Sequence, residues 1–135
     1  MPNGLRTTFW VHAVVALIFG IGYLFLPTLI TDTFQVQLGD PIVPQMIGVL
    51  MVALCVSSVL AALAHEVERV DIVLKMEVVF TILATLVFIF NIFANALAAI
   101  NWVAVAIFAI FAVVFGYYYL QLRSMQARPE RPAFR

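Results

Sequence analysis

Long apolar runs separated by short polar connections are the most regular feature of this sequence. Arg6 is the only charged side chain in the first run, and none lies between Asp40 and Glu66 or between Glu77 and Arg123. A helix needs about 20 apolar residues to cross roughly 30 Å of hydrocarbon, so the last run is long enough for two crossings. The pattern predicts four spans, near residues 8–26, 44–64, 76–95 and 101–120.

These spans should be helical, because backbone amides in hydrocarbon must be paired within their own segment, and the apolar runs are continuous rather than alternating. Pro27 should close the first span. The second connection, 65–77, contains no Gly or Pro and could extend either neighbouring helix, with Asp71 and Lys75 as an (i, i+4) pair. We predict an all-α, four-helix transmembrane bundle, running up-down-up-down as one domain over residues 1–122.

Composition supports a membrane protein. Of the 135 residues, 65% are hydrophobic and 10% are charged, whereas a soluble domain is about 45–50% apolar and about 25% charged. This excludes a soluble globular domain and a disordered chain. The first apolar stretch is too long for a typical signal-peptide core and lacks a small-residue cleavage site, so we expect it to be retained.

The basic residues predict the orientation. All seven fall before the first span, between the second and third, or after the fourth: Arg6, Arg69, Lys75, Arg123, Arg128, Arg131 and Arg135. The positive-inside rule then makes both termini cytoplasmic, with a bacterial inner membrane as the expected location. We expect a flexible Arg/Pro-rich tail over 123–135 that is attracted to anionic lipid headgroups. The remainder is not basic, which argues against nucleic-acid binding.

Small residues and phenylalanines suggest how the spans meet their neighbours. Small residues four apart let helix backbones approach closely, as with Ala16 and Gly20, or Ala112 and Gly116. The second span carries a similar stripe: Ala53, Ser57 and Ala61, with Ser58 and Ala62 beside it. The third span is instead rich in phenylalanine: Phe80, Phe88, Phe90 and Phe93. We expect the stripes to face helix neighbours, and either surface could contact other membrane subunits.

Three residues form the candidate site. His12 is an ionisable side chain inside a span, and such groups are costly in membranes and often functional. Glu77, expected at the inner boundary, could approach His12 with Tyr117 nearby, and the group could hold a proton or a polar headgroup. A haem, a chlorin or a quinone is conceivable there. The alternatives are a histidine that only bonds a neighbouring helix and a solvated Glu77 at a helix start. Ser57, Ser58, Thr81 and Thr85 are expected to bond back to their own helices.

A resemblance adds to this interpretation. The first span ends Gly20-Ile-Gly22-Tyr-Leu-Phe-Leu-Pro27, and the second begins Pro44-Gln-Met-Ile-Gly48-Val-Leu. This arrangement resembles small four-helix bacterial membrane proteins of the broad DoxX-like kind, and the resemblance covers the first two spans. It implies a compact four-helix bundle, and some members of these families are linked to respiratory or redox partners.

The sequence contains no Walker loop, nucleophile elbow, CxxC pair or metal-binding motif. We therefore expect no catalysis and no metal site. The first hypothesis is an accessory or structural subunit of a larger membrane complex, for electron transfer or light harvesting. The second is a binder or carrier of an apolar small molecule, such as a quinone, sterol or carotenoid. A small transporter fits less well, because no mid-membrane carboxylate is expected.

Overall fold

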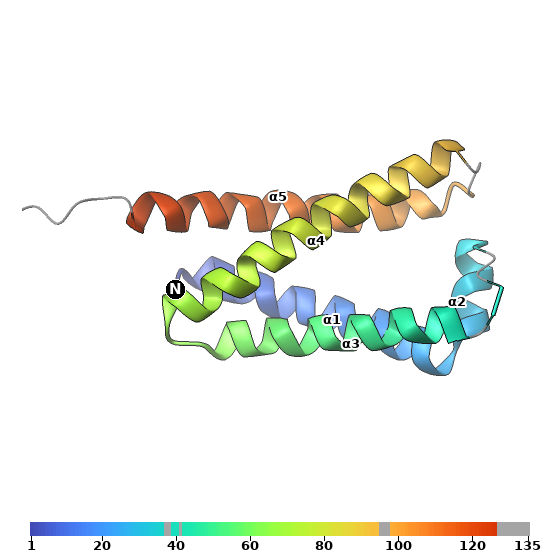
Figure 1. The fold of residues 1–135 in the computed structure, drawn as a ribbon, viewed down its shortest axis with the longest axis horizontal. Helices are drawn as coiled ribbons and strands as arrows, with labels where there is room; N and C mark the ends of the chain where they lie inside the picture. Colours follow the sequence, from blue (N-terminus) through green and yellow to red (C-terminus); the bar gives the residue numbers. More distant parts are fainter. Residues whose placement is uncertain (37–38, 41, 95–97, 127–135) are drawn as a thin grey trace, which may run out of the picture.

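The computed structural model describes residues 1–36, 39–40, 42–94 and 98–126. Within these residues the chain forms five α-helices and no strand: α1 (Asn3–Phe25), α2 (Pro27–Phe34), α3 (Ile42–Leu63), α4 (Val67–Ala94) and α5 (Asn101–Gln126). Figure 1 shows α1, α3, α4 and α5 as four long rods, with the short α2 at one end. These four are long and apolar enough to cross a membrane. The all-α prediction and the four apolar helices are confirmed.

The long helices begin or end beyond the predicted spans, and in α1, α4 and α5 polar side chains continue the helical backbone past the apolar runs. The clearest case is α4, which begins at Val67, whereas the third span was expected to begin near residue 76. The connection between α3 and α4 is therefore only 64–66. Asp71 and Lys75 form the expected ion pair on this extension.

The helix α2 was not predicted. Pro27 ends α1, as expected, but it also occupies the first helical position of α2, where its missing N–H costs nothing. Gln35, in a left-handed conformation, closes α2. Pro44 lies in the first turn of α3 and is buried, two residues after the helix begins.

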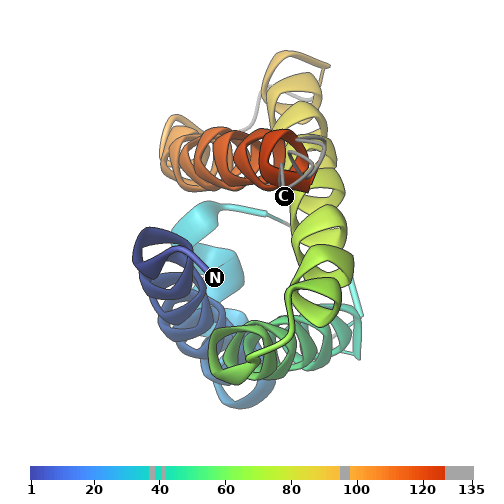
Figure 2. The ribbon, with the colours of Figure 1, turned by 90° about the vertical axis from the view of Figure 1, so that its left-hand side faces the viewer.

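The long helices pack as two pairs. The most extensive contacts are between α1 and α3 and between α4 and α5, with far fewer between the pairs. In Figure 1 the colour gradient shows α1 and α4 running one way and α3 and α5 the other. The end view of Figure 2 shows the start of α1 and the end of α5 at the same end of the bundle.

Glycines allow the close approach of α1 and α3. A Cβ on Gly48 would lie 2.8 Å from the Leu24 backbone nitrogen, and one on Gly20 would lie 2.9 Å from a Val52 methyl. The predicted stripe on α1 therefore does face a helix neighbour. The stripe on α5 does not face a neighbouring helix at Gly116, because a Cβ there would meet nothing within 4 Å.

The phenylalanines of α4 do not share one face. Phe80 and Phe88 pack on Phe108 of α5, with ring centroids 5.8 and 5.7 Å away, whereas Phe90 and Phe93 are exposed. The phenylalanines of the third span therefore form two separate groups and not one surface. Phe80 and Phe88 lie about two helical turns apart and so share one side of α4. Phe90 and Phe93 fall on another side of the helix, so the two groups point apart.

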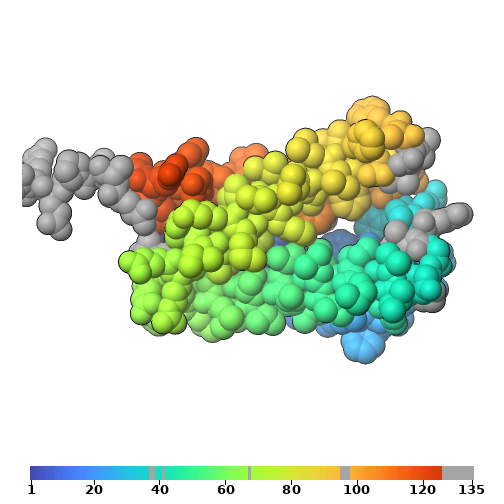
Figure 3. Space-filling model, viewed as in Figure 1, coloured from blue at the N-terminus to red at the C-terminus, as the bar shows by residue number. Residues whose placement is uncertain are grey.

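Much apolar surface remains uncovered by the chain itself. Only 17% to 28% of the residues in the most apolar part of each span are buried. Figure 3 shows α4 lying on α3 near its start and separating from it farther along. Such surface suits a hydrocarbon surrounding rather than water.

The predicted tail begins later than expected, because α5 continues through Arg123 to Gln126. Residues 127–135, with the remaining arginines, lie outside the described residues.

Candidate functional site

Three polar side chains from three helices meet inside the bundle. His12 comes from α1, Ser58 from α3 and Glu77 from α4. The Ser58 hydroxyl donates to Glu77 Oε1 at 3.0 Å and lies 2.8 Å from His12 Nδ1. The direct separation of His12 Nδ1 and Glu77 Oε1 is 3.6 Å. We call His12, Ser58 and Glu77 the polar cluster.

The polar cluster is enclosed. His12 is 4% exposed, and Ser58 and Glu77 are fully buried. Phe111 and Phe115 of α5 present their rings to the imidazole edge-on, with centroids 4.8 and 5.4 Å away. The cluster thus joins α1, α3 and α4, and α5 seals it with apolar rings, which strengthens its electrostatic contacts by excluding water.

One carboxylate oxygen of Glu77 is unsatisfied. Oε1 accepts from Ser58 and lies 3.5 Å from the Ser57 hydroxyl. Oε2 is buried and has no hydrogen-bond partner among the described residues. A buried polar atom without a partner is costly, so this one needs an explanation, such as a bound molecule or water.

Glu77 lies inside α4 and not at its start. Because α4 begins at Val67, Glu77 is ten residues into the helix, roughly 15 Å along it. The alternative of a solvated Glu77 at a helix start is therefore wrong, since the side chain is fully buried, while its position at the inner boundary stays a prediction.

Tyr117 does not belong to the polar cluster. It is 62% exposed, and its ring packs on Tyr118. Successive helix residues are rotated by about 100°, so Phe111 and Phe115 point inward where Tyr117 points out. Tyr118 lies instead beside Gly4, where an added Cβ would meet its hydroxyl.

Ser58 was missed. Ser57, Thr81 and Thr85 do bond back to their own helices, as expected. Ser58 instead points away from its helix backbone and bridges two others. Its place beside the small-residue stripe of α3 was the available signal, because that stripe faces the neighbouring helices.

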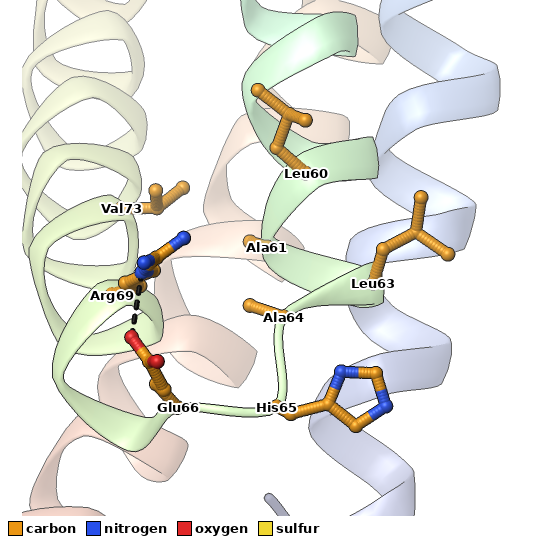
Figure 4. Close-up of a pocket in the computed structure, with 8 residues that line it drawn as sticks. All are labelled: Leu60, Ala61, Leu63, Ala64, His65, Glu66, Arg69 and Val73. Carbon is orange, nitrogen blue, oxygen red and sulfur yellow. Dashed lines mark ion pairs between the residues drawn. The ribbon is translucent and has the colours of Figure 1, made fainter.

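A half-open pocket of about 440 Å³ lies between the end of α3 and the start of α4. Figure 4 shows Ala61 and Ala64 facing Val73 and Arg69, with Arg69 paired to Glu66. The wall is apolar and the rim polar: Leu60, Ala61, Leu63, Ala64 and Val73, then His65, Glu66 and Arg69.

The pocket and the polar cluster lie one helical turn apart along both helices, although neither Ser58 nor Glu77 lines the pocket. Val73 precedes Glu77 by four residues on α4, and Ala61 follows Ser57 by four residues on α3. Residues four apart share a helix face and lie roughly 6 Å apart along the axis. The pocket and the cluster are therefore consecutive layers of one α3–α4 contact.

Metal and haem binding find little support in this geometry. In the described part of the chain, no three His, Cys, Asp or Glu side chains gather closely enough to hold a metal ion. His12 has one ring nitrogen engaged by Ser58, and His65 is exposed beside the pocket. The two imidazoles lie in different surroundings.

Comparison of the chain with family models, with curated proteins and with solved structures finds no match. The resemblance to DoxX-like proteins therefore stays a prediction.

Proposed function

We propose that this chain is an integral protein of a bacterial inner membrane that binds an apolar small molecule carrying a hydrogen-bond donor at one end. The observation that carries this proposal is the unsatisfied Glu77 Oε2, buried one helical turn beyond an apolar pocket. A pocket with apolar walls and a few convergent polar groups is the usual form of a small-molecule site.

The proposed topology is up-down-up-down, with both termini cytoplasmic. The clustering of Lys and Arg supports it through the positive-inside rule. Arg69 and Lys75 lie in the first part of α4 and Arg123 in the last turn of α5, at the same end of the bundle as the start of α1 (Figure 2). The pocket would then open near the cytoplasmic headgroups, within reach of lipid-dissolved molecules.

The chemistry of Glu77 selects among candidate ligands. Ser58 donates to Oε1, so Oε2 remains a hydrogen-bond acceptor, and a ligand that pairs with it must carry a hydrogen-bond donor. A hydroxyl on an apolar ring system, as in a quinol or a sterol, meets this requirement. A carotenoid without hydroxyl groups does not, and an oxidised quinone offers only acceptors.

A pocket-filling substitution tests the proposal. Leu60→Trp places a larger side chain at the pocket wall, and Ile72→Trp makes the same kind of change at an exposed α4 position outside the pocket. Each protein is purified from native membranes, and its lipid extract is compared by mass spectrometry. We expect one enriched compound in the wild type and in Ile72→Trp, and its loss in Leu60→Trp. No enriched compound in the wild type, or its retention in Leu60→Trp, contradicts the proposal.

A second candidate function is that of an accessory subunit in a larger membrane complex, without catalysis of its own. The exposed aromatic group at the far ends of α4 and α5 favours it: Phe90 and Phe93 are 68% and 75% exposed, and Phe93 packs on Trp102. Aromatic side chains dominate the energetics of many interfaces. Purification in mild detergent at native abundance should recover a co-migrating partner, and Phe93→Ala should reduce its amount. A lone chain counts against this function.

A further inference from the structure

We propose that the polar cluster is a proton-binding site, in which the Ser58 hydroxyl relays one proton between His12 and Glu77. The inference goes beyond ligand binding and does not depend on the pocket taking a ligand.

The geometry allows only a bridged transfer. His12 Nδ1 and Ser58 Oγ are 2.8 Å apart, and Ser58 Oγ and Glu77 Oε1 are 3.0 Å apart. Both separations are hydrogen-bond distances. The direct separation of Nδ1 and Oε1, 3.6 Å, is too long for a hydrogen bond. Ser58 is therefore the link through which a proton passes between the two groups.

The same heavy-atom positions serve two proton arrangements. In the first, a doubly protonated His12 donates from Nδ1 to Ser58, and Ser58 donates to the Glu77 carboxylate. In the second, protonated Glu77 donates from Oε1 to Ser58, and Ser58 donates to Nδ1 of neutral His12. A hydroxyl has one donor and two acceptor positions, so it fits both directions without moving.

The transfer between the arrangements is balanced. The Nδ1–H bond breaks as a new O–H bond forms on Ser58, while the original Ser58 O–H bond breaks as Oε1–H forms. An imidazolium and a carboxylate become a neutral imidazole and a neutral carboxylic acid. The number of bound protons and the net charge of the pair stay the same.

The surroundings leave the pair to titrate together. The other charged side chain of α1 is Arg6, which lies six residues before His12 and is exposed. Cys55 lies on α3, on the turn before Ser58, and is buried. Asp71 and Lys75 of α4 pair with each other. From α5 the cluster meets the rings of Phe111 and Phe115, while the Arg123 guanidinium lies over Tyr119.

Magnetic resonance on the full chain in lipid nanodiscs tests the relay. The histidine rings are labelled with ¹⁵N and the glutamate carboxyls with ¹³C. Glu77→Gln identifies the Glu77 signal, and His65→Gln leaves His12 as the one labelled histidine. Because the proton is shared, we expect both signals to change at the same pH midpoints.

Ser58→Ala removes the relay, so exchange of the proton between the two groups should slow, and the His12 and Glu77 signals should broaden or split near the midpoints. Ser58→Thr keeps the hydroxyl and should restore the sharp, averaged signals, while Glu68→Gln, at an exposed position of α4, should leave them unchanged. Separate midpoints in the wild type overturn the proposal without any variant, because a coupled pair titrates together. Signals in Ser58→Ala that stay as sharp as in the wild type overturn it as well. Ligand loss in Leu60→Trp is measured separately, so either proposal can fail alone.

Discussion

At the scale of single residues, one buried hydroxyl forms hydrogen bonds with two ionisable side chains. Ser58 is fully buried and supplies the short hydrogen bonds of both His12 Nδ1 and Glu77 Oε1. Leaving a buried polar group without its partner costs more than the bond itself contributes, since the group has already lost its water. The stability of the bundle should therefore be sensitive to this small side chain.

We predict that Ser58→Ala lowers the free energy of unfolding by about 1–3 kcal/mol, because two buried groups lose a partner. Ser124→Ala is the matched control: Ser124 is exposed and bonds only to the Gln121 carbonyl of its own helix. It should change stability by less than about 0.5 kcal/mol. Denaturant unfolding in mixed micelles measures both, and equal effects would contradict the account.

At the scale of elements, the pairing of α1 with α3 rests on backbone proximity. Gly20 and Gly48 face each other, and an added Cβ on Gly48 would lie 3.0 Å from the Gly20 carbonyl oxygen. Membrane helices associate largely through such close packing, because lipid offers little hydrophobic gain. The first half of the chain is therefore held by shape complementarity and not by polar bonds alone.

We predict that Gly48→Ala destabilises the bundle by about 1–3 kcal/mol, since the new Cβ meets backbone atoms that cannot move aside. Gly116→Ala is the control, because its Cβ would enter open space. It should be neutral or stabilise by up to about 1 kcal/mol through better helix propensity. Thermal unfolding in detergent compares them, and a stable Gly48→Ala protein would refute close packing.

The presence of the four long helices could be predicted from the sequence, whereas the residues at which they begin and end could be predicted less well. Four long apolar runs leave few alternatives to four helices. The early start of α4 was only one of two alternatives, because charged residues such as Glu68 and Arg69 suit a loop as well as an exposed helical turn. The helix α2 was missed because eight residues with three threonines carry little periodic signal.

Of the polar cluster, two residues could be predicted from the sequence and the third could not. His12 and Glu77 stand out as ionisable residues within or beside apolar runs. Ser58 does not, since serine in a membrane helix most often bonds its own backbone. Tyr117 was assigned by depth alone, and depth does not say which side of a helix faces inward.

At the scale of the whole molecule, the orientation in the bilayer decides where the pocket opens. We predict that Thr33→Cys, beyond α1, reacts with a membrane-impermeant maleimide added outside intact spheroplasts. Ser124→Cys should react only after permeabilisation. Both are made in a Cys55→Ala background, so that no native thiol contributes. Labelling of both sites from one side would contradict four crossings with cytoplasmic termini.

The central claim is that Glu77 receives the polar end of a bound small molecule, and native mass spectrometry of protein released from its own membranes tests it most directly. Glu77→Gln should keep its carbonyl toward Ser58 and place an NH2 group where Oε2 stood, so a donor faces a donor. Glu68→Gln makes the same change at an exposed position. We predict one adduct of a single mass on the wild type and on Glu68→Gln, and its loss from Glu77→Gln. An adduct that persists in Glu77→Gln, or a wild-type protein that carries none, would contradict the account.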